Sequence, residues 1–169
     1  QEYISGVNLS SSVLSTKNES KNIINTRLLT TDNFLYSGNI LPLTYESFFK
    51  FNNFVNKDNN KNNFSIFDSN SFSELSQNME NISEDLISYF KLVGSNGVDF
   101  ILSEEVFKNN SSNSHSLDSD DLYVIEVNPR IQGTYESCEE ILGIKEEDLD
   151  RIFNQFEQVE EVIGKSSTG

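Results

Sequence analysis

The stretch Tyr-Val-Ile-Glu-Val-Asn-Pro-Arg-Ile-Gln-Gly-Thr-Tyr-Glu at residues 123–136 decides the fold, together with Leu-Val-Gly-Ser-Asn-Gly-Val-Asp-Phe-Ile at residues 92–101. Both are dense in apolar and β-branched residues and are bounded by turn residues, which predicts two β-strands. Side chains alternate between the faces of a strand, so Glu126 and Asn128 project to the same side, roughly 6.6 Å apart. Pro129 cannot continue a sheet ladder, and it therefore ends the second strand.

The side chains of this pattern suit a cation. Glu126 and Asn128 offer a carboxylate and an amide oxygen, which are ligands that Mg²⁺ prefers. Asp99 lies in the middle of the first strand and would face Glu126 if the strands pair. Two carboxylates facing each other across a ladder repel, unless a cation lies between them. Arg130 adds a planar fork for a phosphate or a carboxylate, and the sequence therefore predicts a site for a cation beside an anion.

Each of these residues also has an ordinary interpretation. Glu126 and Asp99 would serve as solvated strand residues, and the Asn-Pro pair at 128–129 would serve as a strand terminator. We favour the cation site because all of these residues occur together in one pattern.

The residues Glu-Val-Asn-Pro-Arg at 126–130, with Gly-Val-Asp-Phe at 97–100 upstream, resemble the metal-binding end of the ATP-grasp superfamily. The resemblance is to biotin carboxylase, to the large subunit of carbamoyl phosphate synthetase and to archaeal ATP-dependent carboligases. It implies ATP-dependent ligation, in which a small-molecule carboxylate forms an acyl-phosphate and then reacts with an amine or another nucleophile. The alternative is a non-catalytic module, derived from an ATP-grasp lobe and kept for binding or assembly.

The same resemblance implies roles for individual residues. Asp99, Glu126 and Asn128 would hold Mg²⁺ or Mn²⁺ on ATP, Arg130 would face the acyl-phosphate or carboxylate, and Gln132 would lie close to the acid substrate.

The beginning of the chain, Gln-Glu-Tyr-Ile-Ser-Gly, has the pattern of a weak strand followed by a turn. Within the resemblance it corresponds to the hinge between two ATP-grasp subdomains, which offers backbone groups to adenine. The resemblance therefore implies that Gln1, Glu2 and Ile4 bind the nucleotide. An ordinary edge strand is the alternative that the residues leave open.

The remaining sequence predicts an α+β fold, with a mostly antiparallel sheet and flanking helices. Residues 9–14, 23–29 and 34–40 are short β-prone runs separated by polar turns, which indicates an antiparallel meander. Arg27, in the second run, would either point toward a bound triphosphate or substrate or be a solvated strand residue.

Three helices are expected within residues 1–143, the last of them at residues 135–142. Thr44 is a suitable N-cap for the first helix, whose start is expected within residues 42–49. Residues 71–93 repeat apolar side chains at three- and four-residue steps, which predicts a second helix whose buried stripe extends to Tyr89 and Phe90. Ser71 or Ser73 would cap its start, and Gly94 would end it.

The chain is expected to comprise residues 1–143, an ATP-grasp C-terminal subdomain, and residues 144–169, a helix and a polar tail. A helix expected at 146–163 would pack on the domain or mediate a homodimer. Because the resemblance covers only the C-terminal half of an ATP-grasp enzyme, we expect a fragment, or a chain that needs the missing N-terminal lobe. In isolation it should be inactive.

Charge and composition limit the partners and the compartment. The formal net charge of −15 over 169 residues argues against nucleic acids and anionic membranes. No stretch is long and apolar enough to span a bilayer. Cys138 is the only cysteine and no signal-peptide pattern occurs, so we expect a cytoplasmic protein.

Overall fold

The computed structural model describes residues 3–31, 35–50, 67–107, 117, 120–133, 137 and 140–141. The chain divides into two compact units, residues 1–132 and 133–169. The helix expected at 146–163 and Cys138 lie outside the described residues, and the domain boundary expected at residue 143 stays a prediction.

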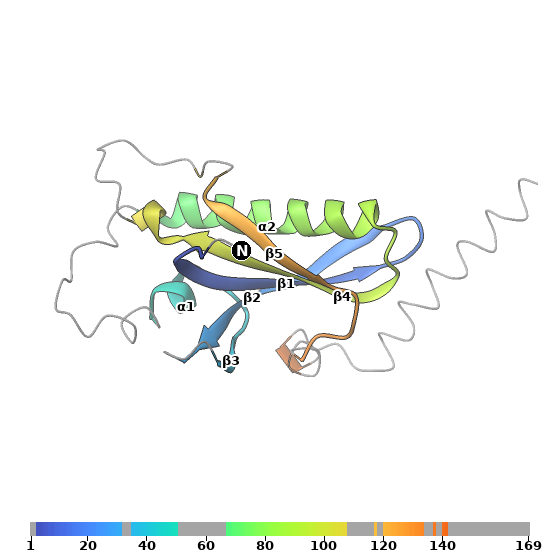
Figure 1. Cartoon of the computed structure of the whole chain (residues 1–169), viewed down its shortest axis with the longest axis horizontal. Helices are drawn as coiled ribbons and strands as arrows, with labels where there is room; N and C mark the ends of the chain where they lie inside the picture. The colour runs from blue at the N-terminus through green and yellow to red at the C-terminus, as the bar shows by residue number, and fades with distance from the viewer. Residues whose placement is uncertain are drawn as a thin grey trace, which may run out of the picture. The chain divides into compact units, whose positions relative to one another are not determined.

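Five strands form one antiparallel sheet in the order β3-β2-β1-β4-β5, drawn in Figure 1. The alternating apolar and polar runs of the sequence produce these strands, and the α+β fold and the antiparallel meander are confirmed. The strand bounds are Gly6–Ser15 for β1, Ser20–Thr30 for β2, Tyr36–Ile40 for β3, Gly94–Ser103 for β4 and Leu122–Asn128 for β5.

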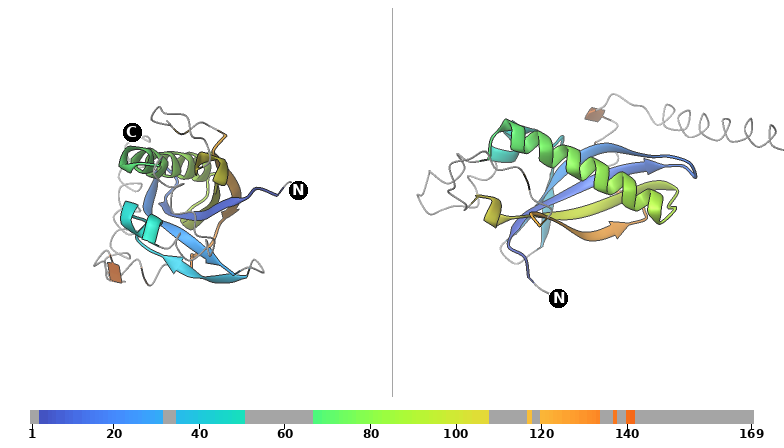
Figure 2. Two further views of the ribbon diagram at one scale, coloured as in Figure 1. Left: turned by 90° about the vertical axis from the view of Figure 1, so that its left-hand side faces the viewer. Right: turned by 90° about the horizontal axis from the view of Figure 1, so that it is seen from above.

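The long helix α2 (Ser69–Tyr89) covers one face of the sheet, as the end-on view in Figure 2 shows. Leu75, Met79 and Ile87 are fully buried against the sheet, so the predicted apolar stripe forms the core at these positions. In the described ranges, no helix is long and apolar enough to cross a membrane.

The start of α2 differs from the prediction. Asp68, and not Ser71 or Ser73, is the N-cap, and its Oδ1 accepts hydrogen bonds from the backbone N–H groups of Asn70 (3.0 Å) and Ser71 (2.8 Å). Folding lowers the pKa of the Asp68 carboxyl, chiefly because the Ser71 backbone N–H and hydroxyl bond to its charged form.

The end of α2 also differs, because the helix stops before the predicted stripe does. Lys91 has a positive φ of 53°, its N–H bonds to Ser88 O, and the Leu92 N–H bonds to Ile87 O. This pair of bonds is the Schellman arrangement that ends helices. Tyr89 is consequently 79% exposed, and the prediction that the buried stripe extends to it and to its exposed neighbour Phe90 is wrong. Gly94 begins β4 and does not cap the helix.

A second part of the core is aromatic. Thr44 caps the short helix α1 (Tyr45–Lys50) as predicted, because its Oγ1 accepts from the Ser47 N–H at 3.1 Å. The cap directs Phe48 into the core, where its ring lies 5.5 Å from that of Phe67 and 6.2 Å from that of Phe107. Phe107 ends the short 3-10 helix η2 (Glu104–Phe107).

A polar group of side chains lies between the sheet and α2. Ser11 Oγ donates to Asn25 Oδ1 at 2.7 Å, and Asn25 Nδ2 donates to Ser76 Oγ at 3.3 Å. Asn22 Nδ2 donates to Ser83 Oγ at 3.2 Å and to Asn25 Oδ1 at 3.0 Å. We call these five residues the inner cluster, and their mutual bonds explain how polar groups are accommodated beneath the helix.

Candidate functional site

Strands β4 and β5 pair so that Asp99 lies directly opposite Glu126 and Gly97 lies directly opposite Asn128. Glu126 and Asn128 are two residues apart on one strand and face the same side. The structure thus brings Asp99, Glu126 and Asn128 together, as the sequence predicts.

A β-bulge makes this pairing compatible with the core. Phe100, which is 1% exposed, pairs with Val124, while its neighbour Asp99 pairs with Glu126, so Ile125 is an extra residue on β5. Neighbouring side chains on β4 point to opposite faces. Asp99 therefore points away from α2, to the side that we call the outer face.

Three side chains on the outer face are joined by hydrogen bonds, and we call Ser10, Asp99 and Asn128 the outer cluster. Ser10 Oγ donates to Asp99 Oδ1 at 2.6 Å, and Asn128 Nδ2 donates to Asp99 Oδ2 at 2.9 Å. Because a carboxylate oxygen can only accept, the amide nitrogen of Asn128 must face Asp99. Its amide oxygen is then turned away from Asp99 and is left as a ligand atom.

The electrostatics of this arrangement favour a cation. Asp99 is partly buried and Glu126 is exposed, while Asn128 is 7% exposed. Within the described part of the chain, no lysine or arginine forms an ion pair with either carboxylate. The described residues also contain no group of three His, Cys, Asp or Glu side chains that could hold a metal. A metal here would thus need the Asn128 oxygen and ligand phosphates in its shell, which is the usual pattern for Mg²⁺.

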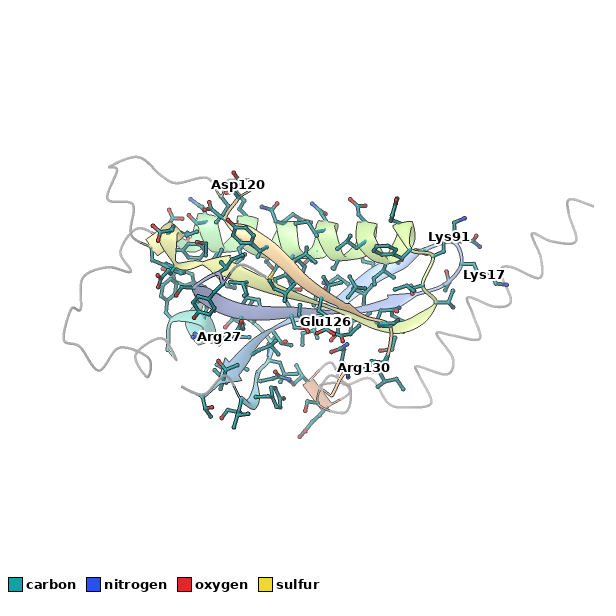
Figure 3. The ribbon with its side chains drawn as sticks, viewed as in Figure 1. Lys17, Arg27, Lys91, Asp120, Glu126 and Arg130 are labelled. Atoms are coloured by element: carbon teal, nitrogen blue, oxygen red, sulfur yellow. The ribbon has the colours of Figure 1, made fainter. Side chains whose placement is uncertain are left out.

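The segment after β5 returns over the outer face. A Cβ atom added to Gly97 would collide with the Gln132 amide, so the Gln132 side chain lies directly against this glycine. Gln132 Nε2 is buried without a hydrogen-bond partner. Arg130 is exposed, and Figure 3 shows that it and Glu126 lie on the side of the sheet away from α2.

The family model for the ATP-grasp domain matches residues 48–134, which include β4, β5 and the Asn-Pro-Arg turn. The chain belongs to the ATP-grasp family. The matched range contains Asp99, Glu126 and Asn128, and it ends just beyond Gln132.

One solved structure shares the fold of this chain. A structure of pyruvate carboxylase from Rhizobium etli is similar with a TM-score of 0.55 and 14% sequence identity, over 86% of this chain and 11% of that one. A protein of the ATP-grasp superfamily from Archaeoglobus fulgidus gives a TM-score of 0.45 and 20% identity, over 82% of this chain and 31% of that one. No curated protein matches the sequence.

The predicted nucleotide-binding residues lie at the beginning of the chain, outside the residues that the family model matches. Gln1 and Glu2 lie outside the described residues, while Ile4 is partly buried just before β1. Ile4 precedes β1, in which Gly6 and Ser10 already lie about 13 Å apart. Ile4 is not one of the side chains that hydrogen bonds join in the outer cluster.

Arg27 is not the solvated strand residue that one interpretation of its sequence position expects. It is 5% exposed, its Nη1 donates to Phe48 O at 2.9 Å, and its guanidinium carbon lies 5.8 Å from the centre of the Phe48 ring. Burial lowers the pKa of this guanidinium. Figure 3 places Arg27 beside α1, apart from Glu126 and Arg130, so it ties α1 to the sheet.

Two contacts of the site, Ser10 with Asp99 and Gly97 with Gln132, are not predicted by any sequence motif. Ser10 reaches Asp99 only because β1 and β4 pair in the register that sets them opposite each other, across 89 positions of sequence. Gly97 was part of the quoted motif, but its contact with Gln132 depends on how the chain turns after Pro129. No pattern in the sequence predicts either contact.

Proposed function

We propose that this chain is a Mg·ATP-binding lobe of an ATP-grasp carboxylate ligase. The observation that carries the proposal is the position of Asp99, which lies opposite Glu126 and holds the Asn128 amide with its oxygen turned away from Asp99. Facing carboxylates without an intervening cation repel. A divalent cation would relieve that repulsion and use the free amide oxygen.

In this proposal, Glu126 and the Asn128 amide oxygen are ligands of Mg²⁺ or Mn²⁺, and Asp99 adds its negative charge beside them. Phosphate oxygens of ATP complete the coordination shell. The adenine end would extend toward Ile4 and the start of the chain, because a nucleoside triphosphate is an elongated ligand. Such a ligand would run along the outer face, with its phosphates at the outer cluster.

The proposed reaction has two steps. A substrate carboxylate oxygen attacks the γ-phosphorus of ATP and ADP leaves, and a nucleophile such as an amine then attacks the acyl carbon and releases phosphate. A bound metal would neutralise charge on the transferring phosphoryl group. Arg130 would bind the acyl-phosphate through its planar fork, and the unpaired Gln132 amide would donate to the acid substrate. The N-terminal ATP-grasp lobe would supply the remaining phosphate contacts.

The test is calorimetric titration of ATP into the full chain, with and without Mg²⁺, for the wild type and for Glu126→Gln. Because a chain with a net charge of −15 attracts divalent cations nonspecifically, Glu80→Gln on α2 is the matched control, with the same charge change on the far side of the sheet. We expect metal-dependent binding that is retained in Glu80→Gln and lost in Glu126→Gln.

Two results would contradict the proposal. One is the absence of metal-dependent binding in the wild type, and the other is equal binding in all three proteins. The double variant Glu126→Gln with Asn128→Ala addresses the alternative of an assembly module. Such a module should still assemble with its partner when both groups are removed.

A further inference from the structure

The further inference concerns Ser10, which lies in the middle of β1 and pairs with Asp99 on β4 and with Thr26 on β2. Ser10 is 5% exposed, and its hydroxyl donates to Asp99 Oδ1 at the short distance of 2.6 Å. Hydrogen bonds to a charged acceptor are short and strong. The hydroxyl therefore fixes the rotation of the Asp99 carboxylate about its Cβ–Cγ bond.

A second hydrogen bond continues from Asp99 to the metal-binding end of β5. The other carboxylate oxygen, Oδ2, accepts from Asn128 Nδ2 at 2.9 Å. The orientation of the Asn128 amide thus depends on the carboxylate plane, which in turn depends on Ser10. The bonds form a relay across three neighbouring strands, β1, β4 and β5.

We propose that Ser10 is a positioning residue, which acts through Asp99 to aim the Asn128 amide oxygen at the metal of a bound Mg·ATP. The inference rests on the proposed function. Residues that orient metal ligands through hydrogen bonds commonly affect metal affinity by one to two orders of magnitude when they are replaced. Without the hydroxyl, Asp99 can rotate, and the amide of Asn128 loses its fixed acceptor.

The adjacent residue Ser11 provides a matched control for this idea. Ser11 is also buried, at 0% exposure, and its hydroxyl also donates to a side-chain oxygen, Asn25 Oδ1, at 2.7 Å. It points to the opposite face of the sheet and has no bond to the outer cluster. Ser10→Ala and Ser11→Ala therefore each remove one hydrogen bond from a buried serine, and only the first belongs to the proposed relay.

The experiment measures the affinity for Mg·ATP by calorimetry in the wild type, Ser10→Ala, Ser10→Thr, Ser11→Ala and Glu126→Gln. We expect Ser10→Ala to bind roughly tenfold more weakly, Ser10→Thr to recover affinity because it keeps a hydroxyl, and Ser11→Ala to bind like the wild type. Urea unfolding of each variant shows whether a loss of affinity follows a loss of stability.

A second readout does not depend on the nucleotide. In nitrogen-15 spectra of the free protein, the side-chain amide signals of Asn128 should shift in Ser10→Ala and stay in place in Ser11→Ala. Wild-type affinity in Ser10→Ala, together with lost binding in Glu126→Gln, would overturn the positioning role and leave the proposed function standing. No metal-dependent binding in the wild type would overturn both.

Discussion

The inner cluster and the outer cluster are built on adjacent residues of β1, yet their surroundings differ completely. Ser11 and Asn25 bond to each other beneath α2, and the amide of Asn25 also reaches Ser76 on the helix. Ser10 and Asp99 bond to each other on the opposite face, beside the exposed carboxylate of Glu126. The inner cluster balances its donors and acceptors, whereas the outer cluster has an excess of acceptors and negative charge.

This difference separates stabilising polar groups from binding ones. A balanced buried group contributes to stability and has no capacity left for a ligand. A group with surplus acceptors is costly for the folded chain alone and becomes favourable when a cation arrives. Asn25→Ala and Asp99→Asn test the distinction directly. Substitutions of Gly97 and Asp68 test the outer face and the helix that lie beside the two clusters.

The largest expected effect is on the inner cluster. Asn25→Ala should lower the free energy of unfolding by about 3 kcal/mol, because the Ser11 hydroxyl and the Ser76 hydroxyl both lose a buried partner. Equilibrium unfolding in urea measures this value. Metal-dependent ATP binding at low denaturant should persist, and a loss below about 1 kcal/mol would mean that solvent replaces these bonds.

Asp99→Asn should have the opposite effect, with little change in stability and a loss of affinity for Mg·ATP. It removes one of two facing carboxylates, so we expect the free energy of unfolding without metal to change by less than about 1 kcal/mol. The new amide would compete with that of Asn128, and Mg·ATP affinity should fall roughly tenfold, or about 1.4 kcal/mol. Calorimetry and urea unfolding on the same samples check both values, and an unchanged affinity would remove Asp99 from the site.

Gly97→Ala should have a smaller effect, confined to the outer face. The added methyl group collides with the end of the Gln132 side chain, which can move away, so the free energy of unfolding should drop by at most about 1 kcal/mol. The Gln132 amide signals in nitrogen-15 spectra should shift. Gly133→Ala is the control, because a Cβ atom there meets nothing within 4 Å, and equal shifts in both variants would contradict the contact.

The smallest effect concerns the helix that covers the inner cluster. Asp68→Ala should slightly lower the melting temperature at pH 7, because α2 loses its N-cap. Folding lowers the pKa of Asp68 below its ordinary value of 3.8, so its contribution is complete above that pH and is lost as the pH falls through the folded-state pKa. Melting curves of the wild type and the variant should therefore converge in acid, and a constant difference would contradict this linkage.

Local patterns in the sequence predicted much of the fold. The alternation in β4 and β5, the Thr44 cap and the buried Leu75 and Met79 each depend on neighbours within a few residues. The end of α2 could not be predicted, because Lys91 adopts the left-handed conformation that a glycine was expected to supply.

The candidate site was predictable only where it lies within one strand. Glu126 and Asn128 share a face of β5 by simple alternation, and Asp99 opposite them follows from pairing of the two expected strands. The contact between Ser10 and Asp99 depends on the register between β1 and β4, which no local pattern specifies. The buried position of the Arg27 side chain depends on how α1 packs against the sheet, because the carbonyl of Phe48 in that helix is its hydrogen-bond acceptor.

The bulge at Ile125 also bears on aggregation. β5 is an edge strand, and its side chains Tyr123, Val124 and Ile125 are all more than one-third exposed, so a regular strand here would offer another chain an apolar template for pairing. The extra residue interrupts the spacing of free N–H and C=O groups along that edge. Deletion of Ile125 should therefore hasten aggregation, seen as increased light scattering during incubation, and unchanged scattering would show that the bulge serves the site alone.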